Sequence, residues 1–158
     1  MGRSTREILE YAEAIAVVGA SKDRTKPAGS IPSGLQRRGY RIVPINPTAA
    51  WLFGRRAYPA LAGMPGPVDV VQVFRPGAEA PDIARQAAAI GARALWLQLG
   101  VRSAEARAIA EAAGMDFVED RCMGAEAARY GIDKPPPIDW VEEASRESFP
   151  ASDAPAWP

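Results

Sequence analysis

The chain has 158 residues with 47% hydrophobic content, which suits one globular domain, and its 19 basic and 19 acidic residues give zero net charge. That balance and the lack of a basic stripe argue against a nucleic-acid footprint, and no apolar run reaches the roughly 18 to 20 residues that a membrane span needs. One cysteine cannot form an internal disulfide, and a chain without histidine lacks the commonest general base and metal ligand.

Strand and helix signals alternate along residues 1–131. Ser4 and Glu7 form a capping box at a helix start, and the apolar run AIAVVG is typical of a strand covered on both faces. Ser30 is expected to cap the second helix, which Gly39 closes. In chain order the patterns predict a helix at 4–13, a strand at 14–19, a helix at 30–39, a strand at 40–46, a short helical piece at 58–61, a strand at 68–74, a helix at 80–90, a strand at 94–100, a helix at 103–114, a strand at 116–120 and a helix at 122–131.

This alternation predicts an α/β fold, a Rossmann-like doubly wound parallel five-stranded sheet with the strand order 3-2-1-4-5. Ligands of such folds bind outside the carboxyl ends of the strands. We therefore expect the loops after Gly19, Ile45, Phe74, Leu99 and Asp120 to share the functional edge.

Two segments are expected, a Rossmann-like domain at 1–131 and a proline-rich acidic tail at 132–158. The domain holds 17 basic and 13 acidic residues, and the tail holds two basic and six acidic ones. The tail has no sustained periodicity, so it is interpreted as a flexible segment or as one that Trp140 and Trp157 fix to the domain or to a second subunit.

The turn after the first strand is wrong for a common dinucleotide site. Only Gly19 of the G-x-G-x-x-G pattern is present, Ser21 stands at the second glycine, and the second strand ends in PINPT without a carboxylate for a ribose. The same turn carries Lys22, Arg24 and Lys26, either as solvated cations or as partners for phosphate groups beside a helix N-terminus.

Several segments, taken together and in order, carry a resemblance. They are IAVVGASKDRTKPAGSIPSGLQRRGYRIVPINPT, YPAL, VDVVQVFRP, LWLQLGV and DRCMGAE. Over about residues 5–130 the chain resembles the stand-alone CoA-binding domain family, which is related to the N-terminal CoA-binding domain of the succinyl-CoA synthetase α subunit. The resemblance implies coenzyme A, or an acyl-CoA, at the carboxyl edge of the sheet.

The resemblance also implies a set of binding residues at the ends of the strands. Phosphate would meet the first turn, the end of the second strand would shape the wall of the site, the end of the third would border the adenosine, and the end of the fourth would line the pantetheine path. The residues are Gly19, Ala20, Ser21, Lys22 and Lys26, then Pro44, Asn46 and Pro47, then Val73, Phe74 and Arg75, and finally Gln98, Leu99 and Gly100. One departure is Thr48, where the family tends to have a lysine or arginine; Arg55 or Arg56 is the expected replacement.

Cys122 follows the fifth strand and begins a helix beside Arg121, a setting that lowers the pKa of a thiol. It is interpreted as a small inert residue, as a thiol that forms a mixed disulfide with CoA, or as a redox-sensing thiol.

Nothing in the sequence forms a catalytic constellation, because paired carboxylates, metal-ligand clusters and histidine are missing. The expected function is therefore a cytoplasmic, non-catalytic CoA-binding or regulatory protein, which self-associates if a helix face is left apolar. Two alternatives stay open: an NAD(P)-dependent oxidoreductase, and a protein-interaction module with a vestigial nucleotide cleft.

Overall fold

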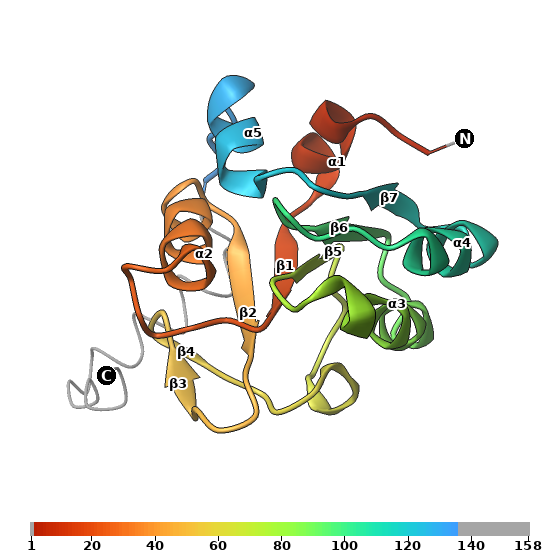
Figure 1. Ribbon diagram of the computed structural model, residues 1–158. Helices are drawn as coiled ribbons and strands as arrows, with labels where there is room; N and C mark the ends of the chain where they lie inside the picture. The colour runs from red at the N-terminus through yellow and green to blue at the C-terminus, as the bar shows by residue number, and fades with distance from the viewer. Residues whose placement is uncertain (1, 136–158) are drawn as a thin grey trace.

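The structure is a computed structural model that describes residues 2–135 (Figure 1). Most of the expected tail, with Trp140 and Trp157, lies outside the described residues, so the domain boundary at 131 stays a prediction. The strands are β1 (Ala14–Val18), β2 (Arg41–Ile45), β3 (Trp51–Leu52), β4 (Arg55–Arg56), β5 (Val70–Val73), β6 (Ala94–Leu97) and β7 (Asp116–Val118). The helices are α1 (Thr5–Tyr11), α2 (Pro27–Arg37), α3 (Ala80–Ala89), α4 (Ala104–Ala112) and α5 (Met123–Arg129), with 3-10 turns η1 (Leu61–Gly63) and η2 (Gly77–Glu79).

The main sheet is five-stranded and parallel, as the alternation predicts, and its order is β2-β1-β5-β6-β7. The fold class is therefore confirmed, and the strand order is corrected. In chain order of the five long strands it is 2-1-3-4-5, because β5 pairs with β1 and not beyond β2. The switch point lies between β1 and β5.

Pro44 gives the physical reason for the corrected order. A proline has no N–H to donate to a neighbouring strand, so within sheets it is confined to edge strands or to strand ends and bulges. The order 3-2-1-4-5 would bury Pro44 in the middle of a strand with neighbours on both sides. In the structure β2 is an edge strand, and on its outer side the Tyr58 N–H donates to the Pro44 carbonyl at 3.0 Å.

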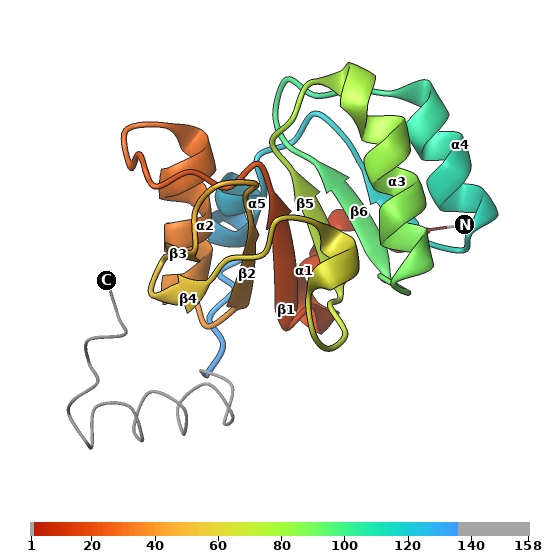
Figure 2. The ribbon, with the colours of Figure 1, turned by 90° about the horizontal axis from the view of Figure 1, so that it is seen from below.

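Helices cover both faces of the sheet (Figure 2). One face packs against α1, α2 and α5, with Ile8, Leu35 and Met123 in its core. The other face packs against η1, α3 and α4, with Leu61 and Ile83 in its core. Burial on both faces explains why β1, β5 and β6 are almost uninterrupted apolar runs.

Two helix starts test the predicted caps. The capping box is confirmed, because the Ser4 hydroxyl accepts from the Glu7 N–H while the Glu7 carboxylate accepts from the Ser4 N–H. The expected cap at Ser30 is wrong. Helix α2 begins at Pro27, whose fixed φ and missing N–H suit the first helical position.

Within residues 2–135, no helix is long and apolar enough to cross a bilayer.

Candidate functional site

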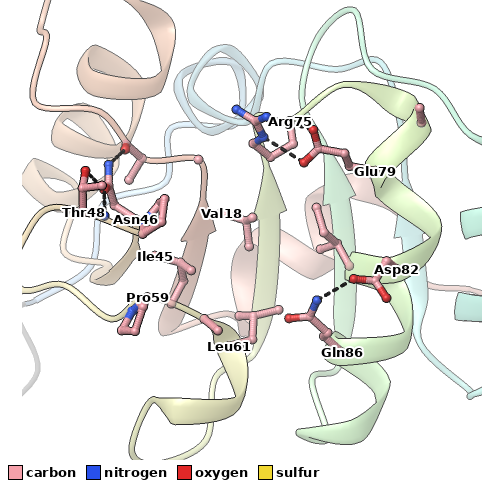
Figure 3. A pocket seen from close by; sticks show the side chains of 16 residues that line it. Val18, Ile45, Asn46, Thr48, Pro59, Leu61, Arg75, Glu79, Asp82 and Gln86 are labelled. Carbon is pink, nitrogen blue, oxygen red and sulfur yellow. Dashed lines mark hydrogen bonds and ion pairs between the residues drawn. The ribbon is translucent and has the colours of Figure 1, made fainter.

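A cleft of about 770 Å³ opens at the carboxyl ends of β1 and β2, on the face that carries η1 and α3 (Figure 3). Asn46 and Thr48 stand on one side of it, and Arg75 and Glu79 stand on the other. The cleft is lined by Val18, Gly19, Ala20, Ile45, Asn46, Pro47, Thr48, Pro59, Ala60, Leu61, Arg75, Ala78, Glu79, Asp82, Ile83 and Gln86. It lies beside the switch point, where open α/β sheets bind ligands.

The floor of the cleft is the turn at Gly19 and Ala20. Gly19 has φ +89°, and a Cβ there would lie 3.1 Å from Cδ of Arg75, so both conformation and space favour glycine. Ala20 is only 2% exposed, yet its N–H donates to no acceptor in the described part of the chain. Buried N–H groups without a partner are rare in native structures. The turn therefore offers a donor to a ligand in the cleft.

The rest of this loop, residues 21–26, is fastened to the first turns of α2. The Ser21 N–H donates to the Ala28 carbonyl at 3.0 Å. That carbonyl would bond the N–H of residue 32 in a regular helix, but Pro32 has none, so the carbonyl is left for Ser21. Gly29 completes the fit, because a Cβ there would lie 2.3 Å from the Asp23 carbonyl oxygen. Pro32 and Gly29 thus let the loop lie directly on the helix.

Asn46 ties the loop after β2 to the loop after β1. Its Nδ2 donates to the Ala20 carbonyl at 2.9 Å. Its Oδ1 accepts from the N–H and the hydroxyl of Thr48 and from the Ala49 N–H, at 2.8, 3.1 and 2.9 Å. Asn46 therefore uses its side chain to shape the cleft, and the Thr48 hydroxyl is already engaged.

The opposite wall carries charge. Arg75 donates to both carboxylate oxygens of Glu79, at 3.0 and 2.8 Å, and this hydrogen-bonded pair lowers the pKa of Glu79 and raises that of Arg75. One turn further along α3, the Gln86 amide donates to Asp82 at 2.8 Å. The wall is thus acidic overall, with an arginine that a ligand phosphate would have to share with Glu79.

Of the residues expected to bind, Gly19, Ala20, Asn46, Pro47 and Arg75 line the cleft. The loop cations do not. Lys22 lines a separate hollow of about 260 Å³, which it shares with Arg24 and with the β3–β4 hairpin at residues 51–54. Lys26 is the exposed N-cap residue of α2, and Ser21 accepts from the Asp23 N–H through its hydroxyl.

Of four other expected residues, two lie inside strands of the sheet and two directly follow a strand. Pro44 and Val73 are buried inside β2 and β5. Phe74 is half-buried, and its Cβ would lie 3.4 Å from a Cβ on Gly19, so it backs the turn at the cleft floor. Gln98 is 4% exposed, and its Oε1 accepts from Nε2 of Gln72 and from the Met123 N–H, both at 3.1 Å.

The remaining three lie further along the carboxyl edge. Leu99 is 66% exposed, and Gly100 follows it with φ +88° and donates its N–H to Asp120 at 2.8 Å. Cys122 is the half-buried N-cap of α5, where its Sγ accepts from the Ala125 N–H at 3.4 Å. Helix α5 belongs to the other face of the sheet, so the structure does not bring Cys122 into the cleft. Arg55 and Arg56 also lie outside it.

The sequence reasoning missed the wall formed by η1 and α3. Its lining residues are Pro59, Ala60, Leu61, Ala78, Glu79, Asp82, Ile83 and Gln86. A usable signal was the spacing of Asp82 and Gln86, which places two polar groups on one side of the helix that follows the switch-point strand. No cluster of residues in the described chain has the composition of a metal site.

Comparison with known proteins gives a family. A profile described as CoA binding domain matches residues 13–128. The uncharacterized protein YneT of Bacillus subtilis (strain 168) is 32% identical over 118 residues, which are 75% of this chain and 87% of that protein. The acetate–CoA ligase [ADP-forming] II of Archaeoglobus fulgidus is 31% identical over 85 residues, which are 52% of this chain and 13% of the ligase.

Solved structures agree with this match. The structure of cell-free ID.343 from Thermus thermophilus has 36% sequence identity and a TM-score of 0.76, over 81% of this chain and 99% of that one. The family resemblance predicted from the sequence is thereby confirmed.

Proposed function

This chain belongs to the family of CoA binding domains, and from that premise we propose that it binds coenzyme A, or an acyl-CoA, in the cleft at the carboxyl edge of its sheet. The observation that carries the proposal is the cleft floor, where the N–H of Ala20 has no partner among residues 2–135 and lies in a turn that Gly19 and Asn46 hold in place. A backbone donor at a strand–helix junction suits an anionic phosphate. The volume of about 770 Å³ is within the range of ligand pockets.

The chain would hold CoA with three groups of residues. Gly19 and Ala20 would bond a phosphate, and Arg75 would add charge on the other side. Ile45, Leu61 and Ile83 would provide apolar surface for the adenosine. Lys22 and Arg24 line a hollow on the far side of the loop, so they would act on the ligand through their field or through the part of it that leaves the cleft.

We further propose that binding is not followed by chemistry. The sequence has no histidine, and the carboxylates that line the cleft already have polar partners, Arg75 for Glu79 and Gln86 for Asp82. A general acid or base needs a free proton site within reach of its substrate. The chain is thus suited to carry or sense CoA in the cytoplasm.

Cys122 adds a testable refinement. Its thiolate would attack a CoA disulfide and release one CoA thiolate, leaving a mixed disulfide on the protein. The pantetheine arm would have to pass from the cleft along the edge to α5. Mass spectrometry after incubation with CoA disulfide tests this step. A CoA adduct on Cys122 supports it, and an adduct-free Cys122 contradicts it.

Native mass spectrometry and calorimetry of the full chain test the main proposal. We expect saturable 1:1 binding of CoA per chain, weaker binding of dephospho-CoA, and no binding of NADPH at the same concentrations. Arg75→Ala should weaken CoA about tenfold, because a charge-assisted hydrogen bond is lost. Arg85→Ala is the matched control, because it removes an exposed arginine of α3 that pairs with Glu105 and does not line the cleft. NADPH binding tighter than CoA binding would favour the oxidoreductase alternative instead.

A further inference from the structure

The cleft has two ends of different chemistry (Figure 3). Arg75 stands at the end beside the Gly19 turn, since its Cδ would lie 3.1 Å from a Cβ on Gly19. Asp82 and Gln86 stand at the other end, beside Leu61. Among the residues that the structure describes, no cation forms an ion pair with the Asp82 carboxylate. Because like charges repel, a phosphate is favoured at the Gly19 end and disfavoured at the Asp82 end.

The side-chain amide of Gln86 is held in one orientation. Its Nε2 donates to Oδ2 of Asp82, one turn earlier on α3, at 2.8 Å. A carboxylate only accepts hydrogen bonds, so an amide turned over would place two acceptor oxygens against each other. Figure 3 shows the Gln86 oxygen on the side away from this bond, toward Leu61. No group in the described part of the chain donates to that oxygen, and the second hydrogen of Nε2 has no acceptor there. The amide therefore offers the cleft one acceptor and one donor, in a fixed order.

Apolar side chains adjoin this amide. They come from β1, β2, η1 and α3, and they are Val18, Ile45, Leu61 and Ile83. Ile83 precedes Gln86 by three residues, so the two lie on the same side of α3. Ligand pockets combine apolar surface of this kind with a few polar groups that fix the orientation of the ligand. This end of the cleft therefore suits a flat apolar ring whose polar edge meets the Gln86 amide.

Building on the proposed binding of CoA, we infer that Gln86, held by Asp82, selects adenine over hypoxanthine at this end of the cleft. Adenine carries an amino donor beside a ring-nitrogen acceptor, which complements the oxygen and the N–H of a glutamine amide. Hypoxanthine has an oxygen in place of that amino group, so two acceptors face each other. A glutamine without a partner accommodates such a change by turning its amide over. The hydrogen bond to Asp82 opposes that turn, so Asp82 is a positioning residue for the base contact.

Calorimetry of the full chain with two ligands tests the inference. The ligands are CoA and its hypoxanthine analogue, in which oxygen replaces the amino group of the base. We expect the wild type to bind CoA about tenfold more tightly, as one base contact of this kind allows. Gln86→Leu removes the acceptor and the donor at similar size, so the two affinities should agree to within about twofold. Asp82→Asn places an amide that both donates and accepts beside Gln86, which permits the turn, so the ratio should also fall. Its change of charge acts on the phosphates of both ligands alike and cancels in the ratio.

Arg85→Leu is the matched control, because Arg85 is an exposed neighbour of Gln86 on α3 that pairs with Glu105 and does not line the cleft. It should keep the wild-type ratio of affinities. The wild-type comparison needs no substitution, so it decides the question even if a variant fails to fold. Equal affinity of the wild type for the two ligands, or a ratio that Gln86→Leu leaves unchanged, overturns the inference and leaves the proposed function standing. Absence of binding by both ligands overturns the two together.

Discussion

Gly29→Ala is the sharpest test of how loop 21–26 is built. A methyl group at this position would stand 2.3 Å from the Asp23 carbonyl oxygen and 2.9 Å from that of Ser21. Ordinary contacts begin at 3.4 Å, so the loop must retreat by about 1 Å. Such a movement would lengthen the 3.0 Å bond from the Ser21 N–H to the Ala28 carbonyl beyond hydrogen-bonding distance.

The energies can be separated with a second glycine of the same helix. Overpacking costs about 1–3 kcal/mol, whereas replacing a helical glycine by alanine gains up to about 1 kcal/mol. At Gly34 a Cβ would meet only a guanidinium nitrogen of Arg37 at 3.7 Å. Gly34→Ala should therefore raise helix stability without introducing overpacking. In urea unfolding, we expect Gly29→Ala to be about 1–3 kcal/mol less stable than Gly34→Ala.

Affinity provides the second readout. The displaced loop would carry Ala20 and Ser21 with it, so Gly29→Ala should weaken CoA about tenfold in calorimetry, and Gly34→Ala should bind as the wild type does. A Gly29→Ala variant that matches Gly34→Ala in stability and the wild type in CoA affinity would refute the reasoning.

Three further changes address other parts of the edge. Asn46→Ala removes the hydrogen bonds to Ala20, Thr48 and Ala49 and should lower the free energy of unfolding in urea by about 1–3 kcal/mol. Asn46→Asp keeps the acceptor oxygen and should lower it less. Equal losses of stability in the two variants would contradict the assigned hydrogen bonds. Glu79→Gln should release Arg75 and tighten CoA binding, most clearly at low salt, and calorimetry showing weaker binding would count against a phosphate role for Arg75. The Gly100 N–H, and then Arg102, lower the pKa of Asp120 below its usual 3.8, so its carboxylate stabilises the fold above that pH and the contribution is lost as pH falls through the folded-state value. Asp120→Asn should therefore make stability less dependent on pH in the acid range, as followed by circular dichroism. An unchanged pH dependence would show that Asp120 is not the group involved.

The sequence predicted the elements better than their partners. Strand and helix alternation is a local signal, and β1, β5 and β6 are read directly from their apolar runs. The order in which strands pair depends on contacts between distant parts of the chain. The apolar run of β5 is equally compatible with pairing to the outer side of β2 or to the free side of β1. Pro44 held that information, because a proline within a strand predicts an edge. The order 3-2-1-4-5 is common among doubly wound sheets, but it is incompatible with a proline in the middle of the second strand.

The same distinction holds for the cleft. Gly19 and Asn46 were predicted because they end their strands at the edge where ligands bind, and they do line the cleft. Lys22 follows Gly19 by three residues, yet the loop turns along α2 and carries it to another hollow. Asp82 was missed because its position depends on how α3 packs across the sheet. Closeness in sequence to the Gly19 turn therefore predicts less well which residues line the cleft than the direction that the backbone takes after the turn.

The edge of β2 limits how copies of this chain can associate. The carbonyl of Pro44 and the N–H of Asn46 are both bonded to Tyr58, and Pro44 itself has no N–H to offer. The backbone groups at the middle of this edge are therefore not available for hydrogen bonds to a strand of a neighbouring molecule, which protects the sheet from strand-to-strand aggregation. The self-association expected from the sequence stays a prediction, and helix surfaces and the short strand β7 at the opposite edge are candidates for it. A filament that grows by adding strands to this edge would have to do so without a hydrogen bond from Pro44.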